Sequence, residues 1–381
     1  MRLTSTIALI LLSFSGFTQQ YYLFIGTYTE GSTGVANGSK GIYVYRFDAT
    51  AGSFQPVSTI ATDNPSYLAL APQGNFVYAV NETHEGTTGN VSAFAFDKKT
   101  GKLTFLDKQT SGGNDPCYVT VDKHRKWVMV ANYSGGSYEA LPVRTDGSLA
   151  PATQIVQHYG SGPNKARQEK AHVHSTILTP DQKYMVVCDL GMDQLSVLRF
   201  NSAATRQPLT PAADSTVHLQ PGIGPRHSCF YPGKPFAYII DELGGTVDAF
   251  HYSNGRFSPL QHISSHPAGY IGDIGSADIH ITPDGRFLYA SNRGDANSLA
   301  IFSIDPATGR LTNKGFQSTM GRTPRNFMID PTGHWLLVAN QNGNNVVLFR
   351  IDPRTGMLTD TGKRIEIPSP VCLCVTSTHP G

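Results

Sequence analysis

Residues 224–242 have the sequence GPRHSCFYPGKPFAYIIDE. Two short apolar runs, 229–231 and 236–240, are joined by a turn at 232–235 that contains Pro and Gly. An antiparallel hairpin returns its entrance and its exit to the same edge of a sheet. We therefore expect Arg226, at the entrance, and Glu242, at the exit, to lie side by side.

The same hairpin recurs along the chain. In each copy an apolar run, a turn and a second apolar run end in Asn or Asp, at intervals of about fifty residues. The turns are anchored at Pro72, Lys123, Pro180, Pro232, Pro283 and Pro331. After most copies come a third apolar run and a D-x-x-T-G-like turn, as in LAIFSIDPATGRL at 299–311. Four strands in a repeat of this length are typical of a β-propeller blade.

The two ends of the chain complete the count of blades. YYLFIGTYT at 21–29 matches only the second strand of a hairpin, and VCLCVT at 371–376 supplies the missing first strand. The sequence thus predicts an all-β, seven-bladed β-propeller with four antiparallel strands per blade, formed by a single domain over 19–381. The ring is closed by the C-terminal strand, which pairs into the N-terminal blade and hides the edges that an open sheet would expose.

Composition excludes several classes of partner. The formal net charge is +2, only 15% of residues are charged, and no basic run carries interleaved aromatic residues, so neither nucleic acid nor a membrane surface is expected as the main partner. No apolar stretch after the first eighteen residues is long enough to span a membrane. The five cysteines do not form a disulfide pattern and are expected to be buried and unpaired. We expect a monomer without a cofactor.

Residues 1–18 resemble an export signal. Arg2 precedes an apolar run at 7–14, and small or polar residues follow before Gln19. This pattern predicts a periplasmic or secreted protein. The alternative is a buried first strand, which would leave the protein in the cytoplasm, but the run lacks the alternation of a strand.

The repeat also predicts which residues meet at the ring's centre. Residues six before and ten after each turn anchor begin the innermost strand and end the adjacent strand, so both sets should surround the mouth of the central channel on one face. The members that are charged residues or histidine are Glu82, His174, Arg226, Glu242, Arg293 and Arg325. Polar groups of both signs that converge on a concave mouth are typical of a binding or catalytic site.

Other polar residues near this mouth have two interpretations. The Asn and Asp that end the second strands recur in nearly every blade, which favours turn hydrogen bonds over ligand contacts. Asp278 and His280 either line the channel or form core hydrogen bonds. An inserted segment at 158–175 is expected to fold over the mouth and to bring Arg167 and Glu169 there. His172 and His174 stand two residues apart, which also suits metal ligation, although no third ligand is evident nearby.

Several motifs resemble the seven-bladed lactonase family, which includes propeller-type bacterial 6-phosphogluconolactonase and fungal carboxymuconate cyclase. They are GSGPNKARQEKAHVHS (160–175), DLGMDQL (189–195), GPRH (224–227), DIHITPDGRFLYASNRG (278–294) and TPRNFMIDPTG (323–333). The resemblance covers nearly the whole chain after residue 18. It implies a catalytic set of one His, two Arg and one Glu, here His174, Arg226, Glu242 and Arg293.

We expect further substrate contacts from the residues around this set, which are Glu82, Arg167, Glu169, His172, His227, Asp278, His280 and Arg325. One departure from the family concerns the tripeptide N-E-L, which is Asp241-Glu242-Leu243 here. A second carboxylate beside Glu242 is expected to raise its pKa or to alter what it orients.

The function that follows is metal-free hydrolysis of a sugar δ-lactone, as by 6-phosphogluconolactonase. His174 or Glu242 would act as general base, and Arg226 and Arg293 would stabilise the oxyanion. Export conflicts with a cytoplasmic phosphorylated substrate, which leaves open an unphosphorylated sugar lactone. Two rival classes remain: a non-enzymatic binding module of the YVTN-repeat type, and a metal-dependent lactonase or muconate-cyclase-like lyase that uses His172 and His174.

Overall fold

The computed structural model describes residues 19–30, 37–83 and 86–378. The predicted export signal at 1–18 lies outside the described residues. The described part consists of β-strands and one short 3-10 helix, η1 (Leu190–Met192). It includes no helix with the length and apolar character needed to cross a lipid bilayer.

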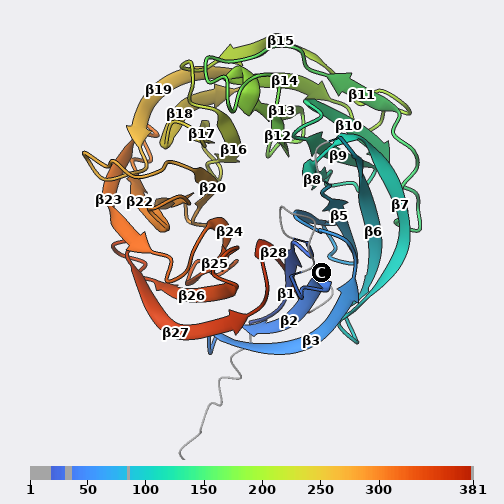
Figure 1. Ribbon diagram of the computed structural model, residues 1–381, viewed down its shortest axis with the longest axis horizontal. Coiled ribbons are helices and arrows are strands. Elements are labelled where there is room, and N and C mark those ends of the chain that lie inside the picture. Colours follow the sequence, from blue (N-terminus) through green and yellow to red (C-terminus); the bar gives the residue numbers. More distant parts are fainter. Residues whose placement is uncertain (1–18, 31–36, 84–85, 379–381) are drawn as a thin grey trace, which may run out of the picture.

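Seven four-stranded antiparallel sheets form a closed ring (Figure 1). From the innermost strand outwards, the first three blades are β28 (Pro370–Ser377), β1 (Gln20–Thr27), β2 (Gly41–Asp48) and β3 (Ser53–Ala61); β4 (Leu68–Leu70), β5 (Phe76–Asn81), β6 (Thr88–Asp97) and β7 (Lys102–Asn114); and β8 (Pro116–Val121), β9 (Trp127–Asn132), β10 (Ser137–Pro142) and β11 (Gln154–Gln157).

The other four blades follow in the same way. They are β12 (Val173–Leu178), β13 (Tyr184–Asp189), β14 (Gln194–Phe200) and β15 (Leu209–His218); β16 (Pro225–Phe230), β17 (Phe236–Asp241), β18 (Thr246–Ser253) and β19 (Arg256–Ser264); β20 (Ser276–Ile281), β21 (Phe287–Asn292), β22 (Ser298–Ile304) and β23 (Leu311–Ser318); and β24 (Pro324–Ile329), β25 (Trp335–Asn340), β26 (Asn345–Ile351) and β27 (Leu358–Glu366).

The ring closes as the sequence predicts. β28 pairs antiparallel with β1, from Tyr21 opposite Ser377 to Thr27 opposite Pro370, and the red and blue strands lie together in Figure 1. Each innermost strand also contacts the innermost strand of the next blade, including β24 with β28 and β28 with β4. The seven-bladed propeller with four antiparallel strands per blade is therefore confirmed.

The core lies between blades. Every pair of neighbouring blades encloses a cluster of buried apolar side chains. Between β16–β19 and β20–β23, for example, Tyr238 and Ile240 pack against Leu288 and Ala290. The second strand of a blade buries both of its faces, so β17 and β25 are buried at every position and lack the in–out alternation of a half-exposed strand, whereas outermost strands such as β3 and β19 keep it. The five cysteines are free, as predicted; three of them are buried, whereas Cys229 and Cys374 are only partly buried.

A repeated hydrogen bond links some of the blades to the D-x-x-T-G turn of the next blade. Tyr238 donates its hydroxyl to the carbonyl of Gly309 (2.8 Å), and Tyr289 donates to Gly356 (2.7 Å). Gly309 has a φ of +71°, and a Cβ there would lie 2.4 Å from the Phe236 ring. Only glycine combines that conformation with so close an approach. The turn motif thus sets the spacing between blades.

β-Bulges at the start of the innermost strands aim side chains toward the ring's centre. The register shifts between Val173 and Ser175 and between Pro225 and His227, which leaves His174 and Arg226 outside the ladder. Corresponding shifts occur in β8, β20 and β24. Bulges bend a strand and redirect a side chain, and they are common beside functional sites.

A backbone hydrogen bond fixes the partner position in each blade. The N–H of the residue that follows the second strand donates to a carbonyl just before the innermost strand, as in Glu242 N to Gly224 O (2.7 Å) and Arg293 N to Gly275 O (3.0 Å). The two sets of positions counted from the turns are therefore neighbours in space.

Candidate active site

Glu242 lies at the centre of the candidate site. Its Oε2 accepts from Arg226 Nε at 2.9 Å and forms an ion pair with Arg293 Nη2 at 2.9 Å, and its Oε1 accepts from Arg167 Nη2 at 2.6 Å. His174 Nε2 lies 3.8 Å from the same Oε2. We call His174, Arg226, Glu242 and Arg293 the central cluster. Three successive blades supply it, and these are the four residues predicted to be catalytic.

The charge state of Glu242 is set by its cationic neighbours. The residue is only 4% exposed, and burial alone would raise its pKa. The guanidinium groups of Arg293 and Arg226 outweigh burial and hold the pKa well below its usual range. Glu242 is therefore a carboxylate at neutral pH. The expectation that Asp241 raises this pKa is wrong, because the arginine charges dominate it, and the Asp241 carboxylate accepts from Thr246 rather than joining the central cluster.

His174 is a neutral imidazole. Burial and the charge of Arg226 hold its pKa well below the usual 6.5, and the side chain is 4% exposed. Its Nδ1 lies 3.7 Å from the Sγ of Cys117 in the neighbouring blade, and its Nε2 faces Glu242. A neutral imidazole has a lone pair that can take a proton, so His174 has the protonation state of a general base at neutral pH.

Arg226 is 2% exposed and anchored on several sides. Its Nη1 donates to the carbonyl of Ala277 at 2.5 Å and lies 3.1 Å from His227 Nε2. Burial and the charges of Arg293 and Arg325 lower its pKa to about 10, which leaves it charged at neutral pH. Arg226 is thus a rigid cation rather than a mobile surface side chain.

A second set of ion pairs, centred on Asp278, lies next to the central cluster. Asp278 accepts from His227 Nδ1 at 2.8 Å and contacts His280 Nε2 at 3.0 Å. It also accepts from the amide of Asn326. Burial would raise the pKa of Asp278, but His280 and His227 hold it well below its usual range. Asp278 is therefore a buried anchor, whereas His280, with 37% of its side chain exposed, lies partly open on the innermost strand.

The part of the inserted segment that precedes β12 reaches Glu242 through Arg167. Arg167 pairs with Glu242 and also donates to the Tyr133 hydroxyl at 3.1 Å, while 44% of its side chain stays exposed. Glu169 contacts His172 at 3.1 Å instead of an arginine of the central cluster. The insertion therefore adds a third guanidinium to Glu242 from above, as predicted for Arg167.

Glu82 and Arg325 form a separate pair on the other side of the ring's centre. Arg325 Nη2 lies 3.7 Å from Glu82 Oε2, and Tyr28 donates its hydroxyl to Glu82 Oε1 at 2.8 Å. Both charged side chains are 17% exposed. Arg325 is close enough to lower the pKa values of Arg226 and His174, so its charge acts on the central cluster.

Two aromatic residues belong to the site although they were not predicted. Tyr133 stacks on His172, with ring centroids 4.4 Å apart, and packs edge-on to His174 at 5.3 Å. It occupies the same repeat position as Glu242 and Arg293, but selecting charged residues passed over it. Tyr28 takes this position in the blade that is split between the chain ends.

The described part of the chain brings no third metal ligand to His172 and His174. His172 Nε2 contacts Glu169 and its Nδ1 lies 3.2 Å from the carbonyl of Tyr133. Among the residues that the structure describes, the two histidines do not join a group of three potential metal ligands.

Known proteins are similar to this chain over nearly its whole length. Residues 22–375 match the model of a family described as lactonase, 7-bladed beta-propeller. The chain is 36% identical to a Bacillus subtilis 6-phosphogluconolactonase over 93% of this chain and 98% of the relative. It is 37% identical to a 6-phosphogluconolactonase of Formosa agariphila over 84% and 89% of the two chains. A solved structure of Pseudomonas aeruginosa periplasmic gluconolactonase is 38% identical, with a TM-score of 0.89 over 94% of this chain and all of the other.

The buried histidines predict a loss of stability in weak acid. Burial and Arg226 lower the pKa of His227 to about 4. Between pH 6.5 and pH 4, this histidine is therefore protonated in the unfolded chain and neutral in the folded chain. From pH 7 to pH 5 this one group lowers the free energy of unfolding by about 2 kcal/mol, and His174 acts with the same sign.

Urea unfolding at pH 7 and pH 5 measures this loss. His227→Gln is expected to reduce the difference between the two pH values by about 2 kcal/mol, while the exposed control His334→Gln should leave it unchanged. An equal loss in wild type and in His227→Gln would contradict the assignment.

Proposed function

Because this chain belongs to the lactonase family of seven-bladed β-propellers, we propose that it hydrolyses a sugar δ-lactone, as 6-phosphogluconolactonase does. The observation that carries the proposal is the central cluster. A buried carboxylate holds two guanidinium groups beside a neutral imidazole, and no covalent nucleophile is needed for this chemistry.

His174 is the better of the two candidate bases. Glu242 is engaged by three arginines, and its low pKa makes it a weak base. His174 keeps a lone pair and removes a proton from water as the water oxygen adds to the lactone carbonyl. Glu242 then acts by positioning Arg226 and Arg293.

The arginines stabilise the charge that develops on the substrate. Addition of water turns the carbonyl oxygen into an oxyanion, which Arg226 and Arg293 attract in a site screened from solvent. The bond from the carbonyl carbon to the ring oxygen then breaks, and the proton held by His174 passes to that oxygen. The product is an open-chain hydroxy acid.

The charge balance favours an anionic or electron-rich substrate. The four arginines Arg167, Arg226, Arg293 and Arg325 form ion pairs with two carboxylates, those of Glu82 and Glu242. A phosphate or carboxylate on the sugar would find a cation here, and so would the oxyanion alone. Two of the relatives are named for a phosphorylated lactone and one is named a periplasmic gluconolactonase. Both substrates therefore belong in the assay.

The assay is a panel of δ-gluconolactone, its 6-phosphate and a muconate-type lactone, each with and without chelator. We expect hydrolysis of a sugar δ-lactone that survives the chelator. Activity that is lost and then restored by a divalent ion would support the metal-dependent rival. Absence of activity on every lactone would favour the binding module.

Replacing Arg226 by Ala should lower kcat/KM by about 10²–10³-fold, because it removes an oxyanion-stabilising cation. The matched control is Arg199→Ala, an exposed arginine on β14. Circular dichroism should show both variants folded. Unchanged turnover in folded Arg226→Ala would remove this residue from the mechanism.

The base assignment predicts a pH profile. The acid limb of kcat/KM should lie below pH 6.5, where His174 becomes protonated, and Arg325→Met should move it upward because the lost charge raises the pKa of His174. His174→Asn should lower kcat by about 10²–10⁴-fold and abolish this limb. A limb that persists in His174→Asn would assign the base to another group.

We also propose that the protein is exported, on the basis of residues 1–18 and of the relative named periplasmic. Export favours an unphosphorylated sugar lactone as the substrate. Cell fractionation should find the mature protein outside the cytoplasm, with an N-terminus near Gln19, and Leu11→Arg in the apolar run should retain it inside. Recovery of full-length protein from the cytoplasm would contradict export.

A further inference from the structure

The last residue of the second strand has the same role in four blades. It is Asn, and its side-chain amide donates to a backbone carbonyl of the segment that enters the blade. These bonds are Asn81 to Asp63 O (2.6 Å), Asn132 to Ser111 O (2.8 Å), Asn292 to Ser265 O (2.7 Å) and Asn340 to Thr319 O (3.1 Å). The structural interpretation of these residues is confirmed.

Two blades carry Asp at this position, and in only one of them do both carboxylate oxygens have polar partners. Asp189 accepts from the N–H groups of His172 and Gly191, and His158 Nδ1 lies 2.7 Å from its other oxygen. Asp241 accepts at Oδ2 from the Thr246 hydroxyl (2.7 Å), but its Oδ1 has no hydrogen-bond partner among the described residues. Asp241 is fully buried, and an unpartnered buried carboxylate is costly.

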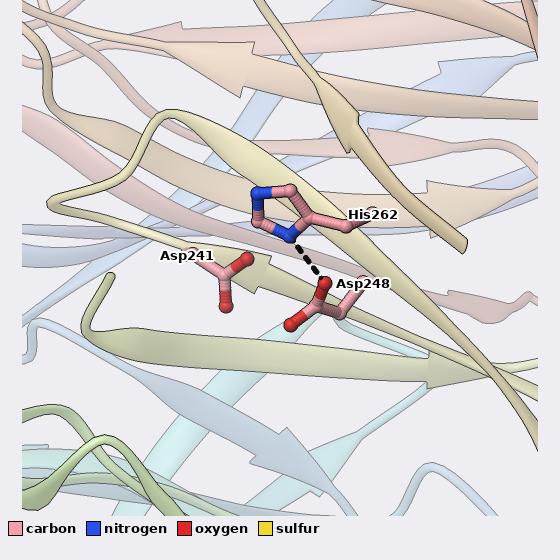
Figure 2. A group of neighbouring side chains, drawn as sticks. All are labelled: Asp241, Asp248 and His262. Carbon is pink, nitrogen blue, oxygen red and sulfur yellow. Dashed lines mark hydrogen bonds and ion pairs between the residues drawn. The ribbon is translucent and has the colours of Figure 1, made fainter. Parts of the chain in front are cut away.

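The unpartnered oxygen lies in a group of three potential ligands. Asp241 ends β17, and Asp248 on β18 stands opposite His262 on β19. One ligand atom from each residue lies within 4.8 Å of the other two. Figure 2 shows both carboxylates beside the imidazole ring, with His262 Nδ1 2.6 Å from Asp248 Oδ1.

The group can be reached from solvent. A third of the His262 side chain and 11% of that of Asp248 are exposed, whereas Asp241 closes the inner end. A groove of about 360 Å³ on the outer part of the blade is lined by Asp248 and His262, with His218 from the preceding blade. An ion could therefore enter past His262 without opening the ring.

We propose that Asp241, Asp248 and His262 bind a divalent transition-metal ion, Zn²⁺ or Mn²⁺. Two carboxylates and an imidazole suit these ions, whereas Ca²⁺ and Mg²⁺ prefer oxygen ligands alone. Ligands on one tetrahedral ion lie about 3.4 Å apart, whereas His262 Nδ1 is 2.6 Å from Asp248 Oδ1. The partly exposed His262 must therefore break this hydrogen bond and present an unprotonated ring nitrogen to the ion. Water would complete the coordination.

The ion would have a structural role. It would compensate the charge of Asp241 and tie β17, β18 and β19 together, one residue before Glu242. The inference does not depend on the proposed function, because no step of lactone hydrolysis passes through this group. The competing arrangement is a proton shared by Asp241 and Asp248, whose pKa values burial raises.

The test is isothermal titration of tag-free, chelator-treated protein with Zn²⁺, Mn²⁺, Ca²⁺ and Mg²⁺. We expect one Zn²⁺ or Mn²⁺ per chain, with weaker or absent binding of the other two ions. At a hundredfold excess over Kd, the ion should raise Tm by about 3 °C.

The variants are chosen so that the fold survives. Asp241→Asn places in this blade the residue that four other blades carry, and His262→Gln changes a partly exposed side chain. Both should fold and lose binding and the Tm increase. His158→Gln, which alters the corresponding pair at Asp189, should bind the ion as wild type does.

Three outcomes would overturn the proposal. Wild type could bind neither Zn²⁺ nor Mn²⁺, or both variants could bind the ion as tightly as wild type does. A rise in Tm for Asp241→Asn without any ion binding to wild type would identify the shared proton instead.

Discussion

The buried carboxylate of Glu242 is the charge on which the centre of the ring depends. Three guanidinium groups converge on it, and without it they would repel one another in a site that is largely shielded from water. The repulsion and the burial are evident at Arg226, whose pKa they lower to about 10. Glu242 and the arginines therefore stabilise each other's charged forms. Burial and the charge of Arg226 keep His174 neutral, although Glu242 acts in the opposite direction. Fold and chemistry meet in this cluster: the bulges aim the side chains, and the charges fix their protonation states.

Much of this arrangement could be predicted from the sequence, because residues at the same position of each repeat occupy the same place in each blade. A hairpin returns its two ends to one edge, so Arg226 and Glu242 had to be neighbours, and the count from each turn added His174 and Arg293. The insertion that carries Arg167 stood out by its length. Tyr133 occupied a position already identified as part of the ring, but its uncharged ring gave no sign that it would stack on a histidine.

Other features depend on cross-strand pairing and burial, which residue order does not reveal. Asp248 and His262 are opposite one another only because β18 and β19 pair in one particular register. The Asp at 241 was visible in the sequence, yet its effect was assigned to Glu242, whereas its side chain points to the other side of the strand and meets Thr246 and Asp248. The neutral state of His174 follows from burial among cations, which spacing alone does not show.

The pairing of β1 with β28 determines when during synthesis the ring can close. The first and last strands of the described chain belong to one sheet, so that blade cannot form until synthesis has produced both. Until then β1 presents an open edge and the blades on either side each lack a neighbour. Contacts between segments so far apart in sequence form slowly. A nascent chain therefore cannot complete its fold until its last strand has been synthesised. For a protein that must cross a membrane unfolded, this ring closure would lengthen the time during which the chain is still unfolded.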